Sequence, residues 1–122
     1  MTNKNIIEKY WKAANARDWK TFASLLHKNI VYDLPQSKER IRGRKDFTEF
    51  NATYPGKWTL EISRLVSDEK QTVTQIKVLT AEEEQTGISF FEFKDGLIYR
   101  IVEYWPVPYD PPDRAINGIE RY

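Results

Sequence analysis

The sequence contains no cysteine and a single histidine, and these shortages remove several classes of chemistry. Without cysteine, its 122 residues can form no disulfide, thiolate nucleophile or cysteine zinc site. His27 has no companion ligands at metal-binding spacing. Five glycines form no phosphate-binding loop, and one histidine allows no Ser-His-Asp ordering. We therefore expect no metal and no cofactor, and we place His27 at a helix end or on the surface.

Long apolar runs and an excess of charge of one sign are also missing. No segment reaches the roughly 20 apolar residues that span a bilayer. The N-terminus leads into a patterned helix instead of an apolar signal core. The 19 basic and 18 acidic side chains nearly balance, which argues against a nucleic-acid partner. The basic stretch 38–45 is expected to be a solvated loop, with an anion contact as the alternative. The expectation is a cytoplasmic protein with no membrane partner.

The sequence does contain helical spacing at its front and strand alternation behind it. Apolar residues recur every three or four positions in 6–14 and again after Asp18, which can cap a second helix. A short third helix ends before Pro55. The strands that we expect are 30–34, 58–63, 71–80, 88–93 and 97–105. This order predicts one α+β domain, 1–122, with about three N-terminal helices packed on a curved antiparallel sheet.

Two further expectations concern packing. Seven large apolar side chains are expected in the core: Trp11, Phe22, Leu26, Trp58, Ile62, Phe91 and Ile101. The segment 106–112 holds four of the chain's six prolines, so it cannot continue the sheet. We expect this segment either to pack as a stiff flap or to cross to a second subunit.

A carboxylate on an apolar strand is the strongest functional signal. In 97–105, an extended chain places the odd-numbered residues, Tyr99 and Glu103 among them, on one face. An ionised carboxylate on such a face is costly unless it is paired, hydrogen-bonded or held at a wetted cavity wall. Glu103 therefore predicts a pocket, because perturbed carboxylates in clefts cluster at functional sites. An ion pair with Lys77 across the strands is the structural alternative.

The order of elements and three motifs resemble the cone-shaped fold shared by nuclear transport factor 2 (NTF2), ketosteroid isomerase, limonene epoxide hydrolase and the SnoaL-like polyketide cyclases. The motifs are the helix 6–18, the strand Val31-Tyr32-Asp33-Leu34-Pro35, and 93–98 with Glu103-Tyr104-Trp105-Pro106. The resemblance covers nearly the whole chain. It implies a hydrophobic pocket between the concave sheet and the helices, and a homodimer formed through the outer face of the sheet.

The resemblance also implies roles for individual residues. Asp33 is similar to the strand aspartate that shuttles a proton beside a carbonyl in ketosteroid isomerase-like members. Tyr10 is similar to their helical tyrosine, which donates a hydrogen bond to the enolate. Ser89 stands where those enzymes have a neutral carboxylic acid. Glu103 is similar to the water-activating carboxylate of limonene epoxide hydrolase-like members, but the partner Arg and Asp are missing, so epoxide hydrolysis is less well supported.

Each candidate also has a structural interpretation. Asp33 can cap a turn or accept from backbone amides, and Tyr10 can be a core tyrosine with a bonded hydroxyl. The candidate catalytic residues are Asp33, Glu103 and Tyr10. The side chains expected around the ligand are Trp11, Trp58, Lys77, Ser89, Phe91, Ile101 and Trp105.

Two functions from different classes follow. The first is a SnoaL-like, cofactor-free isomerase or cyclase, in which a pocket carboxylate acts as general base on a hydrophobic carbonyl compound. The alternative is a non-catalytic ligand-binding or dimerisation module of the same NTF2-like fold. In both cases the expected partners are a hydrophobic small molecule and a second copy of the chain.

Overall fold

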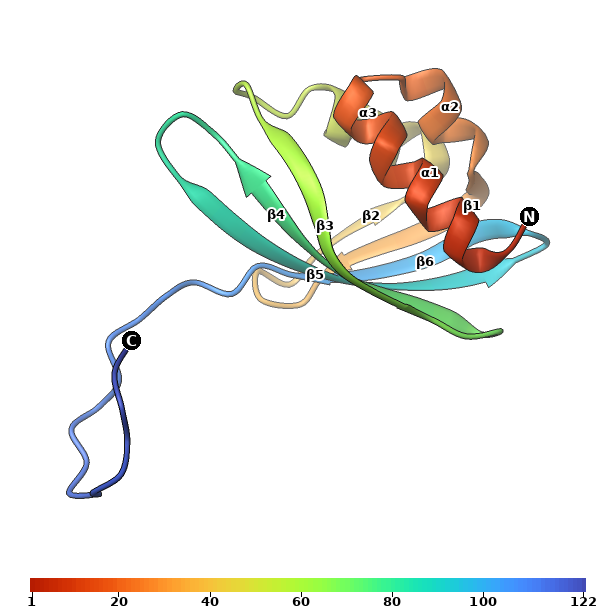
Figure 1. Cartoon of the computed structure of the whole chain (residues 1–122). Helices are drawn as coiled ribbons and strands as arrows, with labels where there is room; N and C mark the ends of the chain where they lie inside the picture. Colours follow the sequence, from red (N-terminus) through yellow and green to blue (C-terminus); the bar gives the residue numbers. More distant parts are fainter.

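A computed structural model describes all 122 residues and shows three helices on one face of a curved sheet (Figure 1). The helices are α1 (Asn3–Ala16), α2 (Trp19–Ser24) and α3 (Arg44–Ala52). The strands are β1 (Leu26–Leu34), β2 (Glu39–Arg42), β3 (Thr59–Ser67), β4 (Gln71–Leu79), β5 (Glu84–Lys94) and β6 (Leu97–Tyr104). The α+β fold with N-terminal helices is confirmed.

The six strands form one sheet in the order β2-β1-β6-β5-β4-β3. The β1 and β6 strands pair in parallel, and every other neighbouring pair is antiparallel. The sheet is therefore mixed, and the expectation of a wholly antiparallel sheet is wrong in this one pairing. Local patterns could not predict this parallel pairing, because α3 and four strands, β2 to β5, lie between β1 and β6 along the chain.

Three segments differ from the sequence expectation. The stretch 38–45, expected to be a loop, contains the edge strand β2. Edge strands tolerate charged side chains, so its composition hid it. The first strand begins at Leu26, not at residue 30, because α2 already ends at Ser24. A register shift in β6 leaves Tyr99 without a partner on β5, so the simple alternation assumed for 97–105 breaks there.

Aromatic rings fill the space between the helices and the sheet. The Tyr10 ring centroid lies 4.8 Å from that of Trp11, 4.7 Å from that of Phe22 and 5.4 Å from that of Phe91. These rings come from α1, α2 and β5, so one cluster joins both helices to the middle of the sheet. Such edge and stacked contacts add to the stability from burial.

Five of the seven side chains expected in the core are buried: Trp11, Phe22, Leu26, Phe91 and Ile101. The other two expectations are wrong. Ile62 is 36% exposed, because β3 is an edge strand that α1 covers only in part. Trp58 is half-buried, and its ring lies 3.5 Å from the Arg17 guanidinium carbon. This cation-π contact ties the end of α1 to the start of β3.

The last segment, 106–122, forms no helix or strand and extends away from the helices and the sheet (Figure 1). All of its residues except Pro111 are exposed. The expectation that it packs on its own chain as a flap is therefore wrong. Pro106 and the prolines that follow cannot donate the ladder hydrogen bonds that would extend β6.

A buried hydrogen bond between α1 and β4 provides a test of this packing. The Trp11 indole N–H donates to Thr74 Oγ1 at 3.1 Å, and both residues are buried. Thr74→Val keeps the side-chain shape but leaves that N–H without an acceptor. We expect the free energy of unfolding, measured by urea denaturation, to fall by about 1–3 kcal/mol. In a Trp11→Phe background the same substitution should cost much less, and equal losses in both backgrounds would contradict this role.

Candidate functional site

The site is built around the carboxylate of Glu103, which lies on β6 and is 5% exposed. One oxygen, Oε1, accepts from the Tyr32 hydroxyl at 2.6 Å and from the Trp105 indole N–H at 3.2 Å. The other, Oε2, accepts from the Ser89 hydroxyl at 2.6 Å. All three donors are neutral, and no ion pair includes Glu103. The carboxylate is therefore buried with hydrogen bonds but without a cation.

Strand order places these donors. The β6 strand lies between β1 and β5, and Ser89 on β5 is the direct Cα partner of Glu103. On the other side, Tyr32 of β1 pairs with Ile101, two residues before Glu103. Side chains two residues apart on a strand share a face. Tyr32, Ser89 and Glu103 therefore all point toward the side of the sheet that the helices cover.

Trp105 reaches the carboxylate because Gly87 leaves room for its ring. A Cβ atom added at Gly87 would lie 2.9 Å from Cη2 and Cζ3 of the Trp105 ring and 3.2 Å from Ile76 Cγ1. Contacts below 3 Å are not tolerated, so a larger residue would push the indole away from Glu103. The Trp105 backbone N–H is held by the Gln36 side-chain oxygen.

Burial sets the protonation of this cluster. Removal from water raises the pKa of Glu103 above its ordinary value, although the hydrogen bonds from Ser89, Tyr32 and Trp105 act in the opposite direction. Burial, together with the charge of Glu103, also raises the pKa of Tyr32 and the pKa of Tyr10. Both phenols therefore stay protonated and remain hydrogen-bond donors.

Burial and the charge of Glu103 raise the pKa of Tyr10 on α1, but the Tyr10 hydroxyl does not donate a hydrogen bond to Glu103. Thr48 Oγ1 is the one fully buried polar side-chain atom without a hydrogen-bond partner. The Tyr10 hydroxyl makes no hydrogen bond within the chain, and Tyr10 is only 2% exposed. Tyr10 is therefore a core residue, as the structural interpretation expected, but the expectation that its hydroxyl is hydrogen-bonded is wrong.

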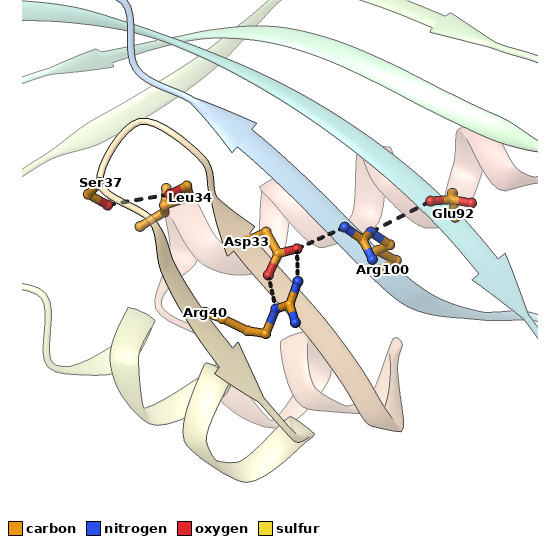
Figure 2. A network of polar contacts seen from close by, with 6 residues as sticks. All are labelled: Asp33, Leu34, Ser37, Arg40, Glu92 and Arg100. Carbon is orange, nitrogen blue, oxygen red and sulfur yellow. Dashed lines mark hydrogen bonds and ion pairs between the residues drawn. The ribbon is translucent and has the colours of Figure 1, made fainter.

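Asp33 lies on the opposite face of the sheet from Glu103. Its carboxylate accepts from Arg40 at 2.6 and 3.0 Å and from Arg100 at 2.8 Å (Figure 2). The hydrogen bonds from Arg40 and the nearby positive charges lower the pKa of Asp33. A single step along β1 separates Asp33 from the inward Tyr32, and such a step changes the face. The two candidate carboxylates do not share a site, and the turn-capping role expected for Asp33 is wrong.

Of the expected ligand-contacting residues, Ser89 and Trp105 touch Glu103 directly, and three others belong to the buried core beside it: Trp11, Phe91 and Ile101. Lys77 and Trp58 lie elsewhere. The Lys77 ammonium is 4.0 Å from Glu84, so the ion pair expected with Glu103 is wrong. Lys77 alternates with the buried Ile76 and therefore points to the outer face.

Sequence reasoning missed Tyr32 and Gly87. The signal for Tyr32 was present, because an inward Ile30 requires Tyr32 to point inward and Asp33 outward. The signal for Gly87 was its place inside a strand, where glycine often marks a close approach of another group. Only the structure shows that this group is the Trp105 ring.

Two surface hollows lie near the site, and Glu103 lines neither. One of about 230 Å³ lies between α1 and β3, beside the expected ligand contact Trp11. Another of about 530 Å³ lies between Thr86 of β5 and the segment 106–122. The Glu103 carboxylate is covered in this conformation, because the residue is only 5% exposed and the Trp105 indole lies against it.

The remaining sequence expectation concerns His27, which the structure places at the start of β1, 9% exposed, and not at a helix end. Its Nδ1 accepts from the Asn29 backbone N–H at 3.0 Å. No cluster of three or more His, Cys, Asp or Glu side chains could hold a metal ion. None of the helices is both long enough and apolar enough to cross a membrane.

Comparisons with known proteins agree with this fold. The chain is 37% identical to a proposed ketosteroid isomerase from Kribbella flavida DSM 17836, with a TM-score of 0.93 over 98% of this chain and 88% of that one. An NTF2-like protein of unknown function from Burkholderia xenovorans LB400 is 22% identical, with a TM-score of 0.80 over 95% and 94% of the two chains. A proposed polyketide cyclase from Pseudomonas putida KT2440 is also 22% identical, with a TM-score of 0.72 over 88% and 93%.

The two relatives at 22% identity support the fold alone. No functionally curated protein matches the sequence. The family description "SnoaL-like domain" matches residues 7–101, which is most of the chain. The match begins within α1 and ends within β6, before Glu103 and Trp105. With that match and the 37% identity to the Kribbella flavida protein, the chain belongs to the SnoaL-like domain family.

Proposed function

We propose that this chain is a cofactor-free isomerase or cyclase, in which Glu103 acts as general base on a hydrophobic carbonyl compound. The supporting observation is a buried carboxylate held by three neutral donors with no cation nearby. Burial raises its pKa, and a carboxylate with a raised pKa is a better base near neutral pH. An ion pair would have lowered the pKa instead.

In the proposed reaction, Glu103 takes a proton from the carbon next to the carbonyl group. The electron pair of that C–H bond moves toward the carbonyl oxygen and gives an enolate. For an isomerisation, the protonated Glu103 returns the proton to another carbon of the conjugated system. For a cyclisation, the enolate carbon attacks a second carbonyl group, and the proton goes to the alkoxide that forms. Neither route changes the oxidation state of the substrate as a whole.

The enolate oxygen needs a hydrogen-bond donor, and Tyr10 is the candidate. Its hydroxyl makes no hydrogen bond within the chain. Burial raises its pKa, so the hydroxyl stays protonated and able to donate to a ligand. Tyr32 and Ser89 have a different role in this proposal. They already bond to Glu103 and act as positioning residues that hold the base.

Substrate entry requires a movement at Trp105. Its indole N–H donates to Oε1 of Glu103, and its ring lies against Gly87. Trp105 is half-buried and is the last residue before the extended segment 106–122. We propose that the substrate displaces this ring and takes its place against the carboxylate.

A non-catalytic ligand-binding module is the second candidate. It is favoured by one observation, that the Glu103 carboxylate is 5% exposed and already bonded to the Trp105 indole. In that case the hydrogen-bonded carboxylate would orient a bound ligand without proton transfer.

We also propose that the chain forms a homodimer through the outer face of its sheet. Three apolar side chains on this face are exposed: Val66 (70%), Phe90 (38%) and Tyr104 (37%). Phe90 and Tyr104 are in edge contact, with ring centroids 6.1 Å apart. Exposed apolar patches of this kind mark interaction surfaces.

The pKa of Glu103 tests the environment of the base. NMR titration of the carboxyl carbons should show the pKa of Glu103 above its ordinary value, with the signal identified by its loss in Glu103→Gln. Tyr32→Phe removes a bond that favours the ionised form, so it should raise this pKa further. A lowered pKa in the wild type would contradict the proposal.

The same shift predicts a change of stability with pH. Because the folded pKa lies above the unfolded value, folded Glu103 binds more protons, and its contribution to stability falls as pH rises between the two values. The free energy of unfolding of Glu103→Gln should therefore increase relative to that of the wild type as pH rises through that window. A difference that does not vary with pH would rule out a raised pKa.

Proton transfer itself can be tested without knowledge of the natural substrate. We expect the protein to catalyse, in D₂O, the exchange for deuterium of the hydrogens next to the carbonyl group of hydrophobic cyclic ketones. Proton NMR measures the rate of this exchange. Glu103→Gln should slow the catalysed exchange by about 10² to 10⁴. Asp33→Asn is the matched control, since the same change on the opposite face should leave exchange unchanged. Ketone binding without exchange in the wild type would favour the binding module.

The dimer has its own test. Phe90→Lys places a charge on the outer face and should shift sedimentation velocity toward the monomer. The control is Tyr54→Lys, because Tyr54 is 57% exposed at the end of α3, on the helical side of the sheet. A dimer that survives Phe90→Lys, or a wild type that sediments as a monomer, would refute a dimer through this face.

A further inference from the structure

The segment 106–122, here called the C-terminal arm, makes no contact that would hold it on its own chain. Sixteen of its 17 residues are exposed. The last hydrogen bond of the chain's main body is that of Trp105 with Gln36, and no ion pair includes an arm residue. The arm therefore depends on something other than its own chain for any fixed position.

Large apolar side chains recur along the arm and face water. They are Val107 (74% exposed), Tyr109 (81%), Ile116 (61%), Ile119 (52%) and Tyr122, which is fully exposed. Segments that remain disordered usually contain few large apolar residues, since they have too little apolar surface to offset the entropy lost on ordering. Their concentration in a segment without a covering partner marks the arm as an interaction surface.

The arm is also stiff at its base. Four prolines in 106–112 favour an extended backbone and act as a semi-rigid spacer. A stiff segment loses little conformational entropy when it docks, so apolar contacts made by such an arm are not offset by a large ordering cost.

The course of the arm is shared with an experimental structure. The match to the Kribbella flavida protein covers 98% of this chain, and the arm is 17 of 122 residues, so nearly all of it is included. A TM-score of 0.93 requires that most of the arm follows a similar path. No hydrogen bond or ion pair fixes the arm on its own chain, so a shared path favours a docking site on another molecule.

The surroundings of the arm point to a second copy of this chain as that molecule. The hollow of about 530 Å³ is lined by the arm residues Val107, Tyr109 and Tyr122 and by Thr86 of β5. Thr86 pairs with the outward Lys77, so the hollow opens beside the outer face of the sheet. That face carries the exposed apolar residues proposed above for the dimer. In a two-fold dimer each copy can offer both an arm and a hollow, and the exchange is reciprocal.

We propose that the C-terminal arm docks on a second copy of the chain, against the hollow formed by its partner's arm base and β5. The arm follows Trp105 directly, so docking fixes the chain next to the residue that covers Glu103. The partner thereby steadies the cover of the site without contributing a reacting group. This inference rests on the dimer through the outer face proposed above, and it does not depend on the proposed proton transfer.

The absence of cysteine allows a direct test with the full chain. Ile119→Cys carries a nitroxide spin label on protein at natural isotope abundance, and this is mixed with ¹⁵N-labelled wild type. Only contacts between copies can broaden amide signals in this sample. We expect loss of signal intensity around Thr86 and the first arm residues of the ¹⁵N chain. Lys9→Cys, labelled in the same way on the exposed side of α1, is the control and should leave those signals sharp.

Removal of 106–122 gives an independent readout. Because no hydrogen bond between side chains and no ion pair joins the arm to the rest of its chain, the shortened protein should keep its thermal midpoint when extrapolated to infinite dilution. Its dimer dissociation constant should rise about tenfold, measured by sedimentation. An unchanged dissociation constant, or broadening seen only when label and isotope share one chain, would overturn the proposal. Neither result would bear on deuterium exchange, so failure of the arm and failure of Glu103 as a base remain distinguishable.

Discussion

Three neutral donors keep a carboxylate stable inside this fold, and the candidate site depends on them. An ionised group taken out of water carries a large cost, which a cation usually offsets. Here Tyr32, Ser89 and Trp105 replace water without adding charge. The pKa of Glu103 therefore stays above its ordinary value, which makes this carboxylate a stronger base than one paired with a cation. Arg40 and Arg100 lie on the other face of the sheet, where they lower the pKa of Asp33.

The parallel pairing of β1 and β6 makes that arrangement possible. It places the first strand beside the last, so that Tyr32 from the front of the chain meets Glu103 from its end. The same pairing carries Asp33 and Arg100 to the outer face, where they form a separate network (Figure 2). This one long-range pairing therefore places a carboxylate without a cation on the inner face and an ion-paired network on the outer face.

The cover of the site links it to the end of the chain. Trp105 fits against Glu103 only because Gly87 has no side chain, and it is followed at once by the stiff arm. Any partner that holds the arm also restrains this cover. The proposed base, its cover and the start of the proposed docking arm thus lie within a few residues of one another, while the helices mainly supply the aromatic core behind them.

The sequence by itself determined most of the elements and identified Glu103 as a candidate site residue. Periodicity located α1 and the hairpins, and an acid among apolar strand residues identified the carboxylate, because these signals arise from neighbours along the chain. Only the tertiary structure decided that Tyr32 faces inward and Asp33 outward, that Lys77 lies far from Glu103, and that β2 is a strand. These outcomes depend on which distant strand becomes a neighbour. That choice is made by the burial of the whole sheet, and a local pattern does not contain it.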